Sequence, residues 1–267
     1  MLCLNPDYVN WALTVDDVKG IPNLKAVLIA STAFGWLDVA GIADLGVPVC
    51  NVRGFSSQAV AEWSTMSMFV LARQIPRLIK DGFPLDYDKD YMKYRGVELK
   101  GKTVGIVGLG NIGTAIAERC TALGMHVTYW SRSARNNNYK YSELSDLMAT
   151  ADVIFPVLAV NDDTTKLLTY QLLDSMKPSA MLIDMVDEVG KGHGLVDLDY
   201  AVQKVANGSL YGLGIEAKPN TFNDYNGNVW AAPPYAWTTD SSMLGCESRL
   251  VDNILAAAQD QFPNRIN

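Results

Sequence analysis

A glycine-rich loop between a predicted strand and a predicted helix constrains the fold of this chain most strongly. The loop reads Gly108-Leu109-Gly110-Asn111-Ile112-Gly113, after a β-rich run at 103–107 and before a segment with apolar residues at helical spacing. In this pattern the first glycine permits a tight turn, the second lets a phosphate approach the backbone, and the third lets the helix pack on the strand.

The helix that follows this loop supplies a site for an anion. Free backbone N–H groups and the positive end of the helix dipole stabilise a phosphate without any charged side chain. The pattern therefore predicts a nicotinamide dinucleotide held by a Rossmann domain. The expected cofactor-binding residues are Gly108, Gly110, Asn111, Ile112 and Gly113.

Apolar β-rich runs alternate with helical stretches along the rest of the chain, a pattern typical of parallel strands joined by helical crossovers. Six strands are predicted around the glycine loop, at 103–107, 126–130, 153–158, 181–184, 212–215 and 229–232. Three more are predicted near the N-terminus, at 1–4, 26–30 and 47–52, with one long helix at 58–80 between the two sets. The predicted fold class is α/β, with a doubly wound parallel sheet and a smaller α/β unit.

Charge and composition limit the partners of this chain. Its 267 residues carry a formal net charge of −7 and no run of Lys or Arg, which argues against a nucleic-acid or acidic-membrane surface. No apolar run approaches the roughly 20 residues that span a bilayer, and no charged-then-apolar leader opens the chain. Its four cysteines are scattered, without metal or disulfide spacing. We expect a cytoplasmic protein that acts on a small-molecule substrate and holds no metal.

The end of the second strand of the large sheet bears on the choice between the two nicotinamide cofactors. NAD sites usually place a carboxylate there, whereas this chain has Ser131-Arg132 and no acidic residue between Glu118 and Glu143. An arginine can pair with the 2′-phosphate of NADP, although Arg132 can equally be an ordinary solvated side chain. The sequence predicts NADP(H) in preference to NAD(H), bound by Ser131 and Arg132.

Several segments carry a family resemblance. The main segments are residues 98–113, Met176-Lys177-Pro178 and Gly194-Leu195-Val196-Asp197. They resemble the D-isomer-specific 2-hydroxyacid dehydrogenases, especially glyoxylate and hydroxypyruvate reductases. The segments 60–62 and 262–267 extend the match over nearly the whole chain. The resemblance implies a homodimer and Glu216 near the nicotinamide, where the family has an Asp. It further implies a dinucleotide-binding domain at 53–238 and a substrate domain split between 1–52 and 239–267.

The resemblance also implies an Arg, a Glu and a His beside the cofactor, and none of them stands at its expected position. Asp187 or Gly192 replaces the Arg, depending on the direction of counting, because the loop at 185–193 is longer than in the family. Thr221 replaces the Glu, and Pro234 replaces the His. These replacements predict a rebuilt active site.

Other residues near these positions are candidates for the chemistry. Two of them lie in the long loop: His193, whose side chain type titrates near neutral pH, and Lys191, which carries a positive charge. Tyr235 lies beside Pro234, and Asp187 lies where the Arg is expected. Each also has a simpler interpretation, as a solvent-facing loop residue or a packed tyrosine. The candidate catalytic residues are therefore Lys191, His193, Tyr235 and Asp187.

Family chains normally begin with a further strand and helix before the run that matches 1–6. Either the small sheet exposes an edge strand, or the sequence is a truncated reading, and both alternatives stay open.

Three functions are compatible with the sequence. The first is an NADP(H)-dependent oxidoreductase that reduces a small imine or a carbonyl compound without a carboxylate, because the carboxylate-binding Arg is missing. The second is a catalytically inactive nucleotide-binding homologue, acting as a sensor or assembly partner. The third is an ordinary 2-hydroxyacid or glyoxylate reductase.

Overall fold

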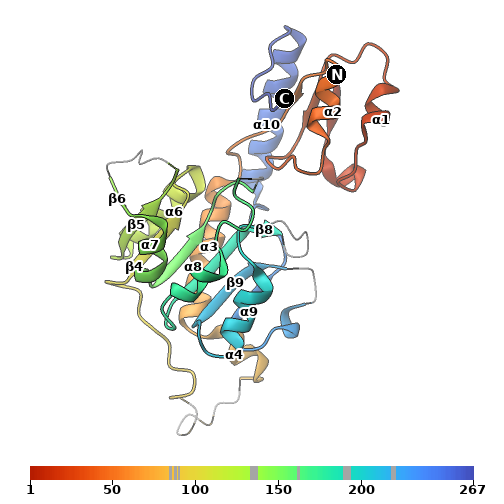
Figure 1. Cartoon of the computed structure of the whole chain (residues 1–267). Coiled ribbons are helices and arrows are strands. Elements are labelled where there is room, and N and C mark those ends of the chain that lie inside the picture. Colours follow the sequence, from red (N-terminus) through yellow and green to blue (C-terminus); the bar gives the residue numbers. More distant parts are fainter. Residues whose placement is uncertain are drawn as a thin grey trace. The chain divides into compact units, whose positions relative to one another are not determined.

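The computed structural model describes residues 1–83, 86, 89, 91–132, 138–160, 163–188, 194–217 and 221–267, with only the backbone of 186–188. The chain divides into two units (Figure 1). The first unit joins Met1–Ser56 with Thr238–Asn267, and the second is Ser57–Trp237. The predicted limits at 52/53 and 238/239 lie within a few residues of these.

The first unit contains a parallel sheet with the strand order β1-β2-β3. The strands are β1 (Leu2–Leu4), β2 (Val27–Ile29) and β3 (Val49–Cys50). Its helices are the 3-10 helix η1 (Pro6–Val9), α1 (Val15–Lys19), α2 (Val39–Asp44) and α10 (Asp240–Ala258).

Helices pack on both faces of this small sheet, and successive side chains of β2 point alternately to one face and the other. Val27 and Ile29 pack into one cluster with residues of α1 and α2. Leu28 points to the other face, where it packs with Ala257 of α10. The end of the chain pairs with the edge of the sheet, since the Ile266 N–H donates to the Val49 carbonyl at 2.9 Å. Residues from both ends of the chain therefore build one core.

The second unit contains a seven-stranded parallel sheet with the strand order β10-β9-β8-β7-β4-β5-β6. The strands are β4 (Thr103–Val107), β5 (His126–Trp130), β6 (Lys140–Tyr141), β7 (Val153–Pro156), β8 (Met181–Glu188), β9 (Gly212–Glu216) and β10 (Val229–Ala232). The direction of winding reverses between β4 and β7, and ligands of such sheets bind beyond the carboxyl ends of the strands at that point. The predicted α/β fold class is confirmed.

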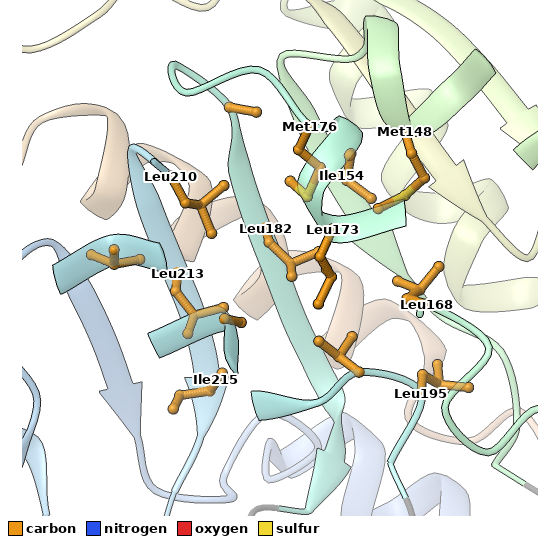
Figure 2. Packing of buried hydrophobic residues seen from close by; sticks show 14 of the residues in the cluster. Met148, Ile154, Leu168, Leu173, Met176, Leu182, Leu195, Leu210, Leu213 and Ile215 are labelled. Carbon is orange, nitrogen blue, oxygen red and sulfur yellow. The ribbon is translucent and has the colours of Figure 1, made fainter. Parts of the chain in front are cut away.

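Helices cover both faces of the large sheet. One face carries α7 (Leu144–Thr150), α8 (Tyr170–Ser175) and α9 (Leu198–Ala206), and the other carries α3 (Ser57–Ala72) and α6 (Asn111–Ala122). Figure 2 shows the first of these cores, where Leu182 and Leu213 of the sheet meet Leu173 of α8. The remaining helices of the described part are α4 (Ile75–Lys80) and the 3-10 helix η2 (Phe222–Asp224). The sheet is therefore buried between two helical layers.

The prediction of one continuous helix at 58–80 is wrong, because α3 and α4 are separate helices. Gln74 lies between them with a left-handed backbone (φ 53°), and Pro76 is the second residue of α4. Proline has no N–H to continue the hydrogen bonds of a preceding helix. Helical spacing of apolar residues continues through such a break and does not reveal it.

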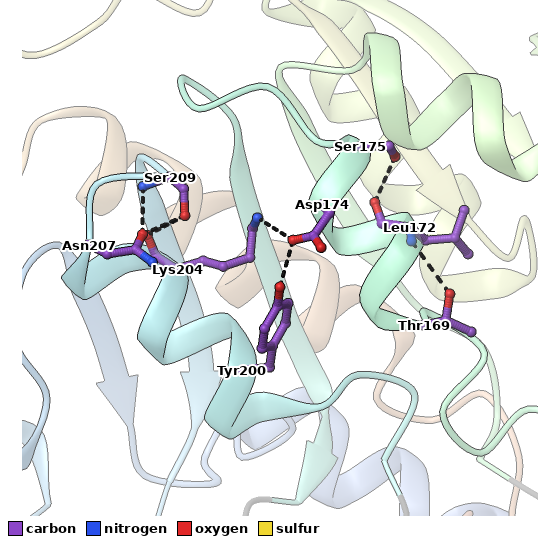
Figure 3. Close-up of polar contacts among 8 residues, drawn as sticks. All are labelled: Thr169, Leu172, Asp174, Ser175, Tyr200, Lys204, Asn207 and Ser209. Atoms are coloured by element: carbon purple, nitrogen blue, oxygen red, sulfur yellow. Dashed lines mark hydrogen bonds and ion pairs between the residues drawn. The ribbon is translucent and has the colours of Figure 1, made fainter.

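A polar cluster fastens α8 to α9 (Figure 3). One oxygen of Asp174 accepts hydrogen bonds from the Tyr200 hydroxyl at 2.7 Å and from the Lys204 ammonium at 2.9 Å. The hydrogen bond from Tyr200, and then that from Lys204, lowers the pKa of the Asp174 carboxyl. The Lys204 side chain is buried, so the Asp174 carboxylate compensates the hydration that the Lys204 ammonium loses on burial.

Among the described residues, no helix has the length and apolar character needed to cross a membrane.

Candidate functional site

The glycine loop follows β4 and begins α6. Gly108 has a φ of 107°, a backbone conformation that residues with a side chain rarely adopt. Its N–H donates to the Trp130 carbonyl of β5 at 2.9 Å. A Cβ atom on Gly113 would lie 2.2 Å from the Gly108 carbonyl oxygen, so this position requires glycine. A Cβ atom on Gly110 would meet nothing within 4 Å. The loop therefore leaves open space above Gly110.

The N-terminus of α6 has no side-chain cap. Gly110 is the N-cap residue, and side-chain capping of this helix end is absent from the described part of the chain. The N–H groups of Asn111 and Ile112 belong to that turn, where backbone donors lack partners within the helix. Uncapped donors beside open space fit the pyrophosphate of a dinucleotide. The described residues therefore fit the cofactor that the glycine pattern predicts.

Arg132 lies just beyond β5 and forms an ion pair that the sequence did not reveal. Its Nη1 atom is 3.7 Å from Oδ2 of Asp163, and both side chains are largely exposed. Asp163 follows β7, outside the stretch between Glu118 and Glu143 that contains no acidic residue. The carboxyl ends of parallel strands meet at one edge of the sheet, so the position of Asp163 after a neighbouring strand is a signal that could have revealed this pair. Arg135, a second arginine that the sequence offers for the 2′-phosphate, lies outside the described residues.

The long loop after β8 is only partly described. Strand β8 runs to Glu188, four residues beyond its predicted end, and includes the backbone of Asp187. Lys191 and His193 lie outside the described residues. The pairing of β8 with β9 is irregular between Asp184 and Glu188.

Glu216 connects the ends of two neighbouring strands. It is the last residue of β9 and is 8% exposed. One of its carboxylate oxygens accepts a hydrogen bond from the Ala236 N–H at 3.3 Å. The segment after β10 that contains Pro234 and Tyr235 is thereby held at the end of β9, and Tyr235 itself is exposed.

A second carboxylate is buried on the adjacent strand. Asp184 of β8 is 1% exposed and pairs in register with Ile215 of β9. Carboxylates are rarely buried without a polar environment that stabilises them. Strands β8 and β9 therefore both carry a buried acid, Asp184 in the middle of β8 and Glu216 at the end of β9. Among the described residues, no group of His, Cys, Asp or Glu side chains is arranged to hold a metal ion.

Known proteins resemble this chain over most of its length. The sequence profile of the "D-isomer specific 2-hydroxyacid dehydrogenase, NAD binding domain" matches residues 65–235. Glycerate dehydrogenase of Methylorubrum extorquens is 29% identical over 256 residues, which cover 91% of this chain and 79% of that protein. Glyoxylate reductase of Aeropyrum pernix is 30% identical over 269 residues, covering 94% and 79% respectively.

A solved structure is similar in fold as well as in sequence. It is an acyclic imino acid reductase in complex with NADPH and D-Arg, with a TM-score of 0.82 and 27% identity. The match covers 96% of this chain and 83% of that chain. With the matched NAD-binding domain and the seven-stranded sheet, these similarities identify a nicotinamide-dependent oxidoreductase. This chain belongs to the D-isomer-specific 2-hydroxyacid dehydrogenase family.

Proposed function

We propose that this protein is an NADP(H)-dependent reductase of a small imine. The observation that carries this proposal is Pro234, which stands where the family resemblance places the proton-transferring histidine. Reduction of a carbonyl compound leaves negative charge on oxygen and requires a proton donor beside it. A protonated imine already carries its proton on nitrogen, so its reduction does not require that donor.

The cofactor and the chain have separate tasks in this reaction. The bound dinucleotide supplies a hydride, which adds to the imine carbon and leaves an amine and the oxidised cofactor. The loop at 108–113 and the N-terminus of α6 bind the pyrophosphate. The similarity to an imino acid reductase, solved with NADPH, supports both the substrate class and the cofactor.

The acidic residues of β8 and β9 support a cationic substrate. Asp184 and Glu216 are buried carboxylates on neighbouring strands, and Asp187 lies further along β8. A negative environment stabilises a protonated imine relative to its neutral form. An anionic keto acid would lack the arginine that the family resemblance places after β8. These acidic residues thus favour an imine over the family's 2-keto acids.

The substrate class is tested by a matched set of compounds. NADPH oxidation is followed with glyoxylate, with hydroxypyruvate, with pyruvate and with acetone. Pyruvate and acetone are also tested after addition of methylammonium, which forms the imine reversibly. We expect turnover with an imine mixture and little with glyoxylate, hydroxypyruvate or the ketones alone. Fast reduction of glyoxylate alone would identify an ordinary 2-hydroxyacid reductase. Tight NADPH binding without turnover on any compound would identify the inactive homologue.

The cofactor preference is tested at Arg132. We propose that this side chain leaves Asp163 and pairs with the 2′-phosphate of NADPH, since exposed ion pairs contribute at most about 1 kcal/mol. The variant Arg132→Gln should weaken NADPH binding about tenfold, as measured by fluorescence titration, and leave NADH binding unchanged. Arg249→Gln, on α10, is the control. Equal affinities of the wild-type protein for NADPH and NADH would contradict the preference.

A further inference from the structure

An open cavity of about 640 Å³ lies in the second unit, where β4 and β5 begin. Thr103 and His126, the first residues of these strands, are part of its lining. The two strands are neighbours in the large sheet, with β6 on the outer side of β5 (Figure 1). The glycine loop follows the other end of β4. The cavity is therefore separate from the cofactor loop, and its size is typical of a small-molecule site.

The short strand β6 leaves room for this cavity at the side of the sheet. β6 pairs with Thr128 and Tyr129 of β5. Within the described ranges, no strand lies beside His126 and Val127 on that side. Side chains from both faces of the sheet therefore line the cavity around the edge of β5.

Three polar side chains line the cavity from one face of the sheet. Thr103 is paired in register with His126, and Thr128 with Lys140. In-register residues of neighbouring parallel strands point to the same face, and so do residues two apart along one strand. Thr103, His126 and Lys140 therefore project into the same cavity from three strands that are spaced about 4.8 Å apart.

These three side chains have no protein partner in the part of the chain that the structure describes. The His126 imidazole, the Lys140 ammonium and the Thr103 hydroxyl form no hydrogen bond or ion pair there. The Thr103 N–H donates to the carboxylate of Asp152, whose charge is paired with Lys177. In a chain with a net charge of −7, this cavity thus holds a positive charge and hydrogen-bond donors that are available to a ligand.

Apolar side chains contribute to the lining from the other face of the sheet. Met125, Val127 and Tyr139 belong to the lining. All three also pack with the hydrophobic cluster between the sheet and α6. Small-molecule sites typically combine such an apolar surface with a few polar groups that fix orientation. A ligand that fits this cavity therefore has an anionic group for the donors and an apolar body.

We propose that this cavity binds an organic monophosphate, with the phosphate at Thr103, His126 and Lys140 and the apolar body against Met125 and Val127. A phosphate group has three oxygens that point in different directions and match donors on three strands, whereas a carboxylate has two oxygens in one plane. Lysine binds phosphate as a point charge, and an imidazole donates a hydrogen bond in both of its protonation states. The site is independent of the proposed function, because no residue of the cofactor loop takes part.

NMR of the full chain tests the binding directly, because the sequence contains only two histidines. Their ring protons give two sets of signals, and the variant His126→Gln assigns the set of His126. Phenyl phosphate is then titrated into the wild-type protein at constant pH. We expect a saturable shift of the His126 signals. Signals of His126 that do not move at millimolar phenyl phosphate would overturn the proposal.

Related compounds test the class of the ligand. Inorganic phosphate carries the anion without the ring, phenol carries the ring without the anion, and benzoate carries a carboxylate. We expect inorganic phosphate to bind about tenfold more weakly than phenyl phosphate, because it lacks the apolar contact, and phenol to cause no saturable shift. Equal affinities for phenyl phosphate and inorganic phosphate would refute an organic ligand. Tighter binding of benzoate than of phenyl phosphate would refute a phosphate.

Variants of the lining separate binding from a merely structural role. Lys140→Gln should weaken phenyl phosphate binding about tenfold, and Thr103→Val, which keeps the backbone bond to Asp152, about two- to fivefold. Both should keep the melting temperature of the wild-type protein. Lys89→Gln is the matched control, because Lys89 is exposed and lies in the same unit. A lowered melting temperature of Lys140→Gln with unchanged affinity would show that Lys140 only stabilises the fold, which contradicts the proposal.

A competition experiment distinguishes this cavity from the cofactor loop. The titration with phenyl phosphate is repeated in the presence of excess NADP⁺, and we expect an unchanged affinity at His126. Loss of the His126 shift in the presence of NADP⁺ would place the phosphate at the glycine loop and overturn the proposal. If the protein binds no NADP⁺, the proposed function fails, and the shift of His126 together with its loss in Lys140→Gln still decides whether the cavity binds a phosphate.

Discussion

The glycines of the loop at 108–113 have different physical tasks. Gly113 is required by the fold, because a Cβ atom there would lie 2.2 Å from the Gly108 carbonyl oxygen. Gly110 has open space around its Cα and an ordinary φ of −86°, so the protein alone does not require glycine there. The sequence pattern predicted all three glycines together, whereas the structure shows that the fold requires Gly113 and leaves Gly110 available for binding.

This difference predicts opposite results for two alanine variants. Gly110→Ala should leave the melting temperature unchanged and abolish NADPH binding, because the added methyl group fills the space that the phosphate needs. Gly113→Ala should lower the free energy of unfolding by about 1–3 kcal/mol, since the backbone must shift. Denaturant unfolding and fluorescence titration measure the two effects. Unchanged NADPH affinity in Gly110→Ala would show that the cofactor does not approach this loop.

The four cysteines should differ sharply in reactivity. Cys3 is exposed on β1, whereas burial raises the pKa of the Cys120 thiol to about 12 and also raises the pKa values of Cys50 and Cys246. Because the thiolate is the reactive form, we expect one fast-reacting thiol in the native protein and four after denaturation, measured with Ellman's reagent. Cys3→Ser should remove the fast phase. A fast phase that survives this substitution would refute the burial of the other three.

At the scale of whole elements, periodicity and β-rich runs predicted most helices and strands but not all of their ends. The two-residue strand β6 carries too short a pattern to be recognised. The break between α3 and α4 depends on a left-handed Gln74, whose side chain bonds to the Arg95 carbonyl at 2.7 Å. The extension of β8 to Glu188 depends on pairing with β9. These features arise from contacts distant in sequence, which local patterns cannot contain.

Strands β4 and β7 are joined at their starts by Asp152, which gives a prediction for acid stability. Its carboxylate accepts a bond from the Thr103 N–H at 2.9 Å and pairs with Lys177 at 2.9 Å. Burial raises the pKa of Asp152, but the bonds from Thr103 and Lys177 outweigh it and hold the pKa below its ordinary value of 3.8. A lowered pKa in the folded state stabilises the protein above about pH 4, and this contribution is lost as the pH falls further.

The variant Asp152→Asn should therefore be less stable than the wild-type protein at pH 7, with the difference shrinking below about pH 4. Urea unfolding at a series of pH values measures this difference. Asp16→Asn is the control, because the Asp16 side chain is 90% exposed on α1 and should show no such trend. A difference that stays constant down to pH 3 would argue against a charged Asp152 in these contacts.

At the scale of the whole molecule, the fold class followed from the sequence because each predicted strand and helix pointed to the same doubly wound topology. The candidate site was less predictable. No motif marked Asp163, whose pairing with Arg132 depends on two loops that follow different strands. Lys191 and His193, chosen for their chemistry, stay predictions.

The homodimer implied by the family resemblance is a proposal for the second unit. Met66 and Phe69 are exposed, at 37% and 42%, on one side of α3. We expect a dimer by light scattering and a shift toward monomer in Phe69→Asp, because a buried charge opposes association. Val251→Asp, on the exposed side of α10, is the control. Dissociation by Val251→Asp but not by Phe69→Asp would move the interface to α10.

The bond between Asn253 and Asn51 joins the two ends of the chain within one unit, and this has a consequence for synthesis on the ribosome. Strands β1 to β3 emerge first, but the face that holds Leu28 stays without its cover until α10 has been translated. At typical elongation rates the residues between them take roughly ten seconds or more to appear. The second unit has all of its strands by then. The nascent chain therefore carries an incomplete small sheet while the second unit is made, and a segment translated after the second unit completes the first.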